Sequence, residues 1–191
     1  MGVLNVTPDS FSDGGRFFDP DAALAHAGTM AADGADLIDI GGESTRPGSE
    51  PLPLEEELRR VIPVVKALSG RVSMPISIDT YKSEVARKAL EVGASIINDI
   101  SGLRFDPAMA RVAAEYHAPV VLMHIKGTPK DMQVEPVYAD LIGEIRDYLA
   151  GSIEIARSAG IAEDRIIIDP GIGFGKTFDH SLEIIRRLSE F

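Results

Sequence analysis

The sequence contains no cysteine among its 191 residues. Disulfide bonds and thiol chemistry are therefore excluded, and the lack of disulfides fits a reducing compartment. No apolar run approaches the roughly 18 residues that a membrane helix needs, so we do not expect a membrane protein. The basic and apolar regions of a secretory signal peptide are also missing, and we expect a cytoplasmic protein.

Basic residues are outnumbered, with 19 lysines and arginines against 30 aspartates and glutamates, and the formal net charge is −11. An acidic chain repels nucleic acid and anionic membranes, so neither is an expected partner. An anionic small molecule remains compatible with this charge, because one arginine or a bound metal ion can reverse it locally. The length and the hydrophobic content of 45% suit a single globular domain.

Short apolar segments alternate with amphipathic ones along the whole chain. The stripe at Leu54, Leu58, Val61 and Val65 has a period near 3.6 and predicts a helix, which Pro63 should kink or begin. Expected strands are 3–6, 36–42, 75–80, 95–101, 119–124 and 165–170. Expected helices begin near Pro20, with Asp19 as N-cap, and cover 54–68, 83–92, 107–117, 138–159 and the residues from about 180.

This alternation predicts a parallel sheet that is covered by helices. Polar residues recur where the predicted strands end, and in a (β/α) barrel those ends form one rim that carries the active site. A doubly wound open sheet would place a site at one switch point with fewer strands. The sequence therefore favours the barrel. A complete barrel has ~250 residues, so we expect an incomplete (β/α)8 barrel of six βα units with open first and sixth strands.

Three polar residues form the first candidate site: Asp79 in S-I-D-T, Asn98 in I-I-N-D-I and Asp169 in D-P-G. A carboxylate can accept two adjacent N–H groups, and an amide both donates and accepts, so this set suits the edge of a flat heterocycle. The alternative is that the three residues cap the following helices or bind loop backbone, since buried carboxylates need donors. The residues alone leave both interpretations open.

Two loops supply further candidates. The loop 171–176, G-I-G-F-G-K, holds Gly173, which would let backbone approach a flat ligand, and Phe174, which could stack on one. It is not a Walker A motif, and a turn before a helix explains it equally well. Arg46 in E-S-T-R-P-G could clamp a phosphate or a carboxylate, or be a solvated loop residue. Met123, before His124, could line the site or belong to the core.

Several strings occur in order and are more specific together than any one alone. They are N-V-T-P-D-S-F-S-D-G-G, E-S-T-R-P-G, S-I-D-T, I-I-N-D-I, L-M-H-x-x-G-x-P-x-x-M-Q and D-P-G-I-G-F-G-K. With them the whole chain resembles dihydropteroate synthase, a (β/α)8-barrel enzyme of folate biosynthesis. This resemblance implies condensation of (7,8-dihydropterin-6-yl)methyl diphosphate with 4-aminobenzoate, which yields 7,8-dihydropteroate and diphosphate with Mg²⁺ as cofactor. It also implies that sulfonamides, which resemble 4-aminobenzoate, act as inhibitors.

The resemblance assigns roles to matching residues. Asn5 would contact the Mg²⁺ that binds the diphosphate, and Thr45 and Arg46 would meet the diphosphate and the 4-aminobenzoate. The loops 7–17 and 43–51 would close over the substrates. The residues expected to bind the pterin are Asp79, Asn98 and Asp169, with Met123, Gly173 and Phe174 around the ring.

The chemistry follows from these roles. The diphosphate leaves with its bonding electrons, and the dihydropterin ring spreads the positive charge of the methylene carbon. Asp79, if ionised, stabilises that charge, and we take Asp79 and Arg46 as the catalytic residues. Mg²⁺ neutralises the leaving group, with Arg46 and Lys176 as the nearby cations. The amine of 4-aminobenzoate then attacks the carbon.

Part of the family pattern has no counterpart in this chain. The family carries a basic Ser-Arg-Lys segment on its seventh strand and an Arg-x-His on its eighth, and its usual homodimer contacts lie in that region. The resemblance therefore describes residues 1–191 as one pterin-binding barrel domain without the last two βα units.

Two competing interpretations remain. The methyltetrahydrofolate methyltransferases share the pterin carboxylates and the amide, but not the N-V-T-P-D-S-F-S-D-G-G and E-S-T-R-P-G loops, which favour the synthase. A non-catalytic pterin-binding fragment is the second, and turnover with 4-aminobenzoate separates it from an enzyme.

Overall fold

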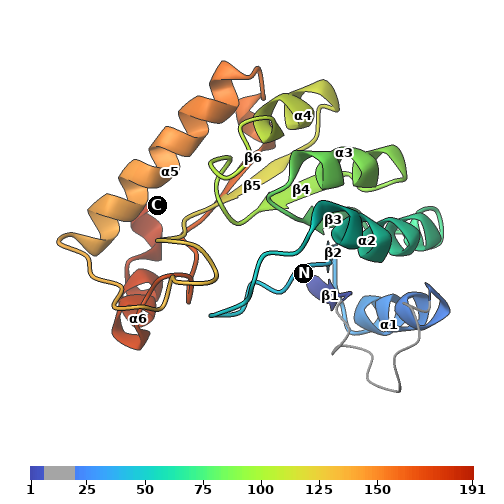
Figure 1. The fold of residues 1–191 in the computed structure, drawn as a ribbon, viewed down its shortest axis with the longest axis horizontal. Coiled ribbons are helices and arrows are strands. Elements are labelled where there is room, and N and C mark those ends of the chain that lie inside the picture. The colour runs from blue at the N-terminus through green and yellow to red at the C-terminus, as the bar shows by residue number, and fades with distance from the viewer. Residues whose placement is uncertain (7–19) are drawn as a thin grey trace.

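The computed structural model describes residues 1–6 and 20–191. Its centre is a six-stranded parallel sheet in which the strands are ordered as in the sequence, β1-β2-β3-β4-β5-β6. Helices α1 to α4 lie along one side of this sheet, and α5 runs beside β5 and β6 (Figure 1). Since each strand pairs with the next one along the chain, every crossover contains a helix, as the predicted βα alternation requires.

The strands are short, with four residues each in the described chain. They are β1 (Gly2–Asn5), β2 (Ile38–Gly41), β3 (Ile76–Asp79), β4 (Ile96–Asp99), β5 (Val120–Met123) and β6 (Ile166–Asp169). The helices are α1 (Pro20–Ala32), α2 (Leu54–Leu68), α3 (Ser83–Glu91), α4 (Met109–Glu115), α5 (Leu141–Ser158) and α6 (Phe178–Arg186), with 3₁₀ turns η1 (Glu163–Arg165) and η2 (Leu188–Glu190).

These elements confirm the predicted order and type, with ends that differ by a few residues. Helix α2 runs without a break through Pro63, so the expectation that Pro63 marks its start is wrong. Helix α6 begins earlier than expected, because the Thr177 hydroxyl accepts the backbone N–H of His180 at 3.1 Å and caps its first turn. The proposed N-cap at Asp19 lies outside the described residues.

The strand register divides the sheet into two faces. Paired residues of parallel strands point to the same side, and successive residues of one strand point to opposite sides. We call the face under the helices the outer face and the opposite one the inner face. The outer face carries Leu4, Ile38, Ile40, Ile76, Ile78, Ile97, Asp99, Val120, Leu122, Ile166 and Ile168. The inner face carries Val3, Asn5, Asp39, Gly41, Ser77, Asp79, Ile96, Asn98, Val121, Met123, Ile167 and Asp169.

The outer face forms the hydrophobic core. Its apolar residues from β1 to β5 are buried, and they share one cluster with apolar residues of helices α1 to α5. A second part of this layer joins Ile145 and Leu149 of α5 to Ile184 of α6. Burial of this apolar surface holds the helices on the sheet and fixes which residues face inward.

The inner face has exposed apolar residues on the first and the last strand. Val3 on β1 and Ile167 on β6 are 48% and 50% exposed, although both are apolar strand residues. The two strands that carry them, β1 and β6, each pair with one neighbour, so the sheet has two open edges, as expected for an incomplete (β/α)8 barrel. In the described part of the chain, no helix is both long and apolar enough to cross a membrane.

Candidate functional site at the strand ends

Four residues at the carboxyl ends of β1 to β4 form one row on the inner face. Asn5 pairs with Gly41, Gly41 with Asp79, and Asp79 with Asn98. A Cβ atom added to Gly41 would lie 3.1 Å from Asp79 Oδ2, so the carboxylate leans over this glycine. A side chain at position 41 would therefore crowd the Asp79 carboxylate.

The carboxylate of Asp79 lacks hydrogen-bond donors among the described residues. It is partly buried, and it accepts no hydrogen bond from any residue that the structure describes. Burial raises its pKa well above 3.8, and the negative charges of Asp39, Glu57, Asp99 and Glu43 raise that pKa further. Within the described chain, Asp79 therefore does not cap a helix or bind loop backbone, which was the alternative role for this residue. A ligand with N–H groups or positive charge would supply the missing donors and stabilise the ionised carboxylate.

Asn98 has a protein partner on the inner face. Its Nδ2 donates a hydrogen bond of 3.0 Å to Asp39 Oδ2. Asp39 is 3% exposed, and burial raises its pKa, while the nearby Ser77 hydroxyl and the Asn98 amide act against this rise. Among the described side chains, Asp39 Oδ1 and Ser77 Oγ are the buried polar atoms that lack a hydrogen-bond partner. The face is therefore richer in acceptors than in donors.

The two carboxylate oxygens of Asp169 have different roles, since one binds the loop backbone and the other is free for a ligand. Its Oδ1 accepts the backbone N–H of Gly171 at 2.7 Å, which is the loop-backbone role left open as an alternative. The register pairs Asp169 with Met123, whereas Asn98 pairs with Val121, so Asp169 lies two residues further toward the rim than the row of Asp79. Within the described chain Oδ2 has no donor, and it remains available to a ligand at this level.

Met123 and Phe174 come together in an apolar cluster at the rim. Met123 is buried, and Phe174 is half-buried against the same cluster. Its other members are Ile100, Ile125, Met132 and Tyr81. This cluster gives the acceptor-rich face an apolar wall, which is the environment that a flat ring requires beside its polar edge.

The glycine loop 171–176 is held against the chain after β5. Gly171 has φ +68°, and a Cβ there would collide with the carbonyl oxygen of His124. Gly175 has φ +65°, and a Cβ there would lie 2.5 Å from the carbonyl oxygen of Lys126. Only glycine fits these two positions. Gly173 is exposed, and its carbonyl oxygen accepts Gln133 Nε2 at 2.6 Å, so this glycine lies at the outer tip of the loop.

Lys176 is not a solvent-facing cation, in contrast to the expectation that it would oppose a phosphate. It is 3% exposed, and its Nζ lies 2.8 Å from His124 Nδ1 and donates to the Phe174 carbonyl oxygen at 2.9 Å. Burial lowers its pKa to about 7, although the Asp169 charge acts in the other direction. Burial, helped by the Lys176 charge, also lowers the pKa of His124 to about 3. The pair fixes the glycine loop from behind.

Arg46 extends from a loop with a rigid base. Glu43 at the start of this loop forms an ion pair with Lys82, which also pairs with the buried Glu57 of α2. Near the loop tip, the Gly48 N–H donates to the Pro129 carbonyl oxygen at 2.9 Å. The base and the tip are thus attached to two different strand-end loops. Thr45 and Arg46 lie between these attachments.

The side chains of Thr45 and Arg46 differ in exposure. Thr45 is half-buried, and Arg46 is exposed, with a guanidinium that no hydrogen bond or ion pair holds within the described residues. The guanidinium is thus able to bind an anion. The other loop expected to close over the site, 7–17, lies outside the described residues. Asn5, at the end of β1, is described and exposed.

Comparisons with known proteins agree with this arrangement. The family model described as pterin binding enzyme matches residues 1–191. The dihydropteroate synthase of Escherichia coli is 50% identical over 191 residues, which are 100% of this chain and 67% of that protein. The chain belongs to the dihydropteroate synthase family. It spans about two thirds of the length of the curated relatives that it matches.

Solved structures of dihydropteroate synthases share this fold. The Clostridium difficile enzyme, solved in the presence of pteroic acid, superposes with a TM-score of 0.91 at 49% identity and covers 99% of this chain and 70% of its own. The Yersinia pestis enzyme, in complex with a sulfonamide drug, has a TM-score of 0.92 at 48% identity, with coverage of 99% and 68%. These likenesses support the synthase interpretation over the methyltransferase one.

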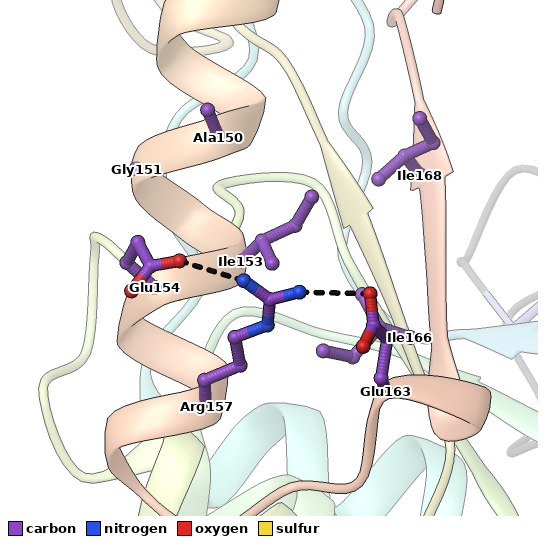
Figure 2. Close-up of a pocket in the computed structure, with 8 residues that line it drawn as sticks. All are labelled: Ala150, Gly151, Ile153, Glu154, Arg157, Glu163, Ile166 and Ile168. Carbon is purple, nitrogen blue, oxygen red and sulfur yellow. Dashed lines mark hydrogen bonds and ion pairs between the residues drawn. The ribbon is translucent and has the colours of Figure 1, made fainter.

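A cavity of about 490 Å³ lies apart from the residues that the synthase resemblance assigns. It is formed between α5 and the outer-face residues Ile166 and Ile168 of β6, and Figure 2 shows Arg157 between Glu154 and Glu163 at its side. None of the predicted pterin, diphosphate or metal residues lines it. The candidate site of this dihydropteroate synthase family member is therefore the inner face at the strand ends.

Sequence reasoning missed several residues that shape the site. Asp39 receives no role in the sequence analysis, although a carboxylate within an apolar strand run is itself a signal. Two further contacts join residues that are far apart in the chain, so no local sequence pattern predicts them. They are the Glu43–Lys82–Glu57 ion network and the pairing of Lys176 with His124.

Proposed function

We propose that this chain forms the substrate-binding face of a dihydropteroate synthase. It would bind (7,8-dihydropterin-6-yl)methyl diphosphate and 4-aminobenzoate and condense them to 7,8-dihydropteroate and diphosphate. One observation carries the proposal: the inner face presents Asp79, Asn98 and Asp169 at neighbouring levels, with oxygens that described donors leave free. Membership of the dihydropteroate synthase family supports the same conclusion.

Recognition of the pterin ring would rest on these three residues. An aminopyrimidinone edge offers adjacent N–H donors, and a carboxylate with a free oxygen satisfies them with charge-assisted hydrogen bonds. Asp169 Oδ2 and the Asp79 carboxylate are the acceptors, and Asn98 supplies an amide between them. Met123 and Phe174 would cover the apolar surface of the ring, because both belong to the cluster beside the rim.

The diphosphate would lie toward Asn5 and Arg46. Mg²⁺ prefers oxygen ligands and usually keeps water and substrate phosphate in its coordination shell. The Asn5 amide oxygen and the Asp79 carboxylate fit this preference, and the register separates the two residues by Gly41, which has no side chain. Within residues 1–6 and 20–191 no group of three or more His, Asp or Glu could hold a metal by itself, so the diphosphate would have to contribute. When bound there, Mg²⁺ would neutralise charge on the leaving group.

The residues of the chain then act on the charges of the reaction. The carbon–oxygen bond to the diphosphate breaks, its electron pair leaves with the diphosphate, and the methylene carbon becomes cationic. The ring spreads this charge, and a cation beside Asp79 lowers the pKa of that carboxyl, which favours the ionised and stabilising form. The amine of 4-aminobenzoate forms the new carbon–nitrogen bond and loses a proton. Arg46 offsets the negative charge on the departing diphosphate.

The 4-aminobenzoate would bind between Thr45, Arg46 and the loop that closes over the rim. The Gly48–Pro129 hydrogen bond holds the Arg46 loop over the ends of the strands, where an aryl group next to the pterin would lie. Sulfonamides, as analogues of 4-aminobenzoate, would compete at the same place. Assembly as a homodimer and location in the cytoplasm stay predictions.

Binding and turnover should be measured side by side, because the chain spans about two thirds of the length of its relatives. We expect pteroic acid to bind in calorimetry, and dihydropteroate formation to depend on Mg²⁺. Asp169→Asn should weaken pteroic acid binding by ~2–4 kcal/mol, because a charged acceptor is lost and ring donors stay unpaired. Asp36→Asn, the same chemical change at an exposed position before β2, is the control.

The outcomes separate an enzyme from a binding domain. Binding without turnover would leave the pterin site in place and remove the claim of catalysis for this chain. If the folded Asp169→Asn protein bound pteroic acid as tightly as the unchanged chain, Asp169 would not belong to the site.

A further inference from the structure

The side chain of Asn98 crosses a neighbouring strand. Asn98 lies on β4 and Asp39 on β2, yet Asn98 Nδ2 and Asp39 Oδ2 are 3.0 Å apart across β3. The register places Asp39 opposite Ser77 and Asn98 opposite Asp79, so the amide passes between these two β3 residues on the inner face. The small side chain of Ser77 leaves room for this reach.

The chemistry of this contact fixes the orientation of the amide. An ionised carboxylate only accepts hydrogen bonds, and of the two ends of an amide only the NH₂ group donates. Asp39 therefore keeps Asn98 Nδ2 directed into the sheet. Asn98 Oδ1 must then point away from Asp39. Within the described residues it accepts no hydrogen bond, and it is not one of the buried unpartnered atoms, so a ligand can reach it.

We propose that Asp39 is a positioning residue that sets Asn98 to present its carbonyl oxygen, and so selects a heterocycle with an N–H donor at that point of its edge. This inference rests on the proposed function and deepens it, because it states which hydrogen-bond pattern Asn98 recognises. Asp39 acts through Asn98 and does not touch the ligand itself.

The burial of Asp39 supports an indirect role. Asp39 is 3% exposed and lies two residues deeper in β2 than Gly41, below the row of Asn5, Asp79 and Asn98. A buried carboxylate that lacks a full set of donors destabilises the fold. The cost is explained if the carboxylate orients Asn98.

A double-mutant cycle with pteroic acid as probe tests the proposal. Calorimetry would compare the unchanged chain with Asp39→Asn, Asn98→Ala and the double variant. We expect Asp39→Asn to weaken binding at least about tenfold, because its amide no longer dictates which end of Asn98 faces it. In the Asn98→Ala background the same change should alter the affinity by less than about twofold. Equal factors in both backgrounds would overturn the proposal.

A second measurement needs no ligand. In NMR spectra of the free protein, the Asn98 side-chain NH₂ should show one proton shifted downfield and protected from exchange by Asp39. Asp39→Asn should abolish that signature, and Asp36→Asn should leave it unchanged. If Asp39→Asn does not fold, Asp39→Ser takes its place. An Asn98 NH₂ signal that is indifferent to Asp39 would contradict the proposal.

The two measurements also separate the proposals from each other. If the unchanged chain does not bind pteroic acid, the proposed function fails, and the NMR comparison still decides whether Asp39 orients Asn98. If the chain binds pteroic acid but Asp39→Asn leaves the affinity unchanged, the proposed function stands and the positioning role is wrong.

Discussion

The two faces of the sheet differ in the hydrogen bonds that their carboxylates accept. On the outer face, Asp99 is fully buried and accepts three hydrogen bonds, from Ser101 N at 2.8 Å, Ser101 Oγ at 2.7 Å and Leu103 N at 2.9 Å. On the inner face, Asp79 accepts no hydrogen bond from the described chain, and Asp39 has one unpartnered oxygen. Both faces belong to the same short strands, so the contrast does not come from local structure.

This difference separates structural carboxylates from functional ones. Nearly all buried polar groups in proteins are satisfied, and an exception calls for a specific reason. Asp99 closes the loop between β4 and α4, which is a complete structural task. The Asp79 carboxylate, which is partly buried, is available to donors from a ligand, and Asp39 contacts the ligand-facing residue Asn98. Three predictions test how firmly this contrast holds.

The largest effect is expected on the outer face. Asp99→Ala should lower the free energy of unfolding by ~3–5 kcal/mol, because the Ser101 and Leu103 donors lose a charged acceptor in a buried site. Chemical denaturation measures this change. A loss below about 1 kcal/mol would show that water replaces the carboxylate, and the outer face would then not be a closed structural layer.

Lys176 is a buried side chain with hydrogen-bond acceptors, like neither Asp99, which has donors, nor Asp79, which lacks them. Its effect on the free energy of unfolding can be measured through pH. Its pKa is lowered to about 7 from 10.5. Between these values the unfolded chain binds the proton and the folded protein does not, so the free energy of unfolding rises with pH across this window. Below pH 7 both states are protonated, and the burial cost is fully present.

The measurement compares the unchanged chain with Lys176→Met. We expect the free energy of unfolding to rise by about 2 kcal/mol more in the unchanged chain than in the variant between pH 7 and pH 9. The raised tyrosine pKa values, to about 12 for Tyr138 and Tyr148, lie above this range, and that of His124, lowered to about 3, lies below it. Parallel profiles would mean that the ammonium stays charged in the folded protein.

The smallest effect on stability, and the opposite sign, is expected on the inner face. Asp79→Asn removes a carboxylate that burial and its neighbours already disfavour, so the free energy of unfolding should stay the same or rise by about 1 kcal/mol. Pteroic acid binding should nevertheless weaken at least about tenfold, because a charged acceptor is lost. A loss of stability as large as that of Asp99→Ala would erase the contrast between the two faces.

The sequence predicted the sheet because its signals are local. Short runs such as I-S-I-D and V-V-L-M are rich in apolar residues, and a polar residue ends the first and follows the second. The parallel order follows from the helix between each pair of strands. The same logic placed Asp79, Asn98 and Asp169 at one rim. Helix ends were less predictable, since Thr177 starts α6 through a side-chain hydrogen bond that competes with other turn geometries.

The rest of the site depends on distances that no local pattern contains. Lys176 follows a glycine loop and suggests a phosphate site, but its burial against His124 depends on how β5 and β6 pair. The partnership of Asp39 with Asn98 joins residues 59 positions apart across a third strand. Alternation alone places both residues on one face, and the three-dimensional register is needed to bring their side chains together.

The strand order has a consequence for how the protein is made. Because each strand pairs with the strand immediately before it, the sheet can be extended at one edge while the ribosome still adds residues. Each new βα unit finds its partner already folded, so no strand has to wait for a distant segment before it pairs. The described part of the rim would thus be assembled in the order of translation, with the Asp39–Asn98 contact able to form once β4 has emerged and the glycine loop joining after β6.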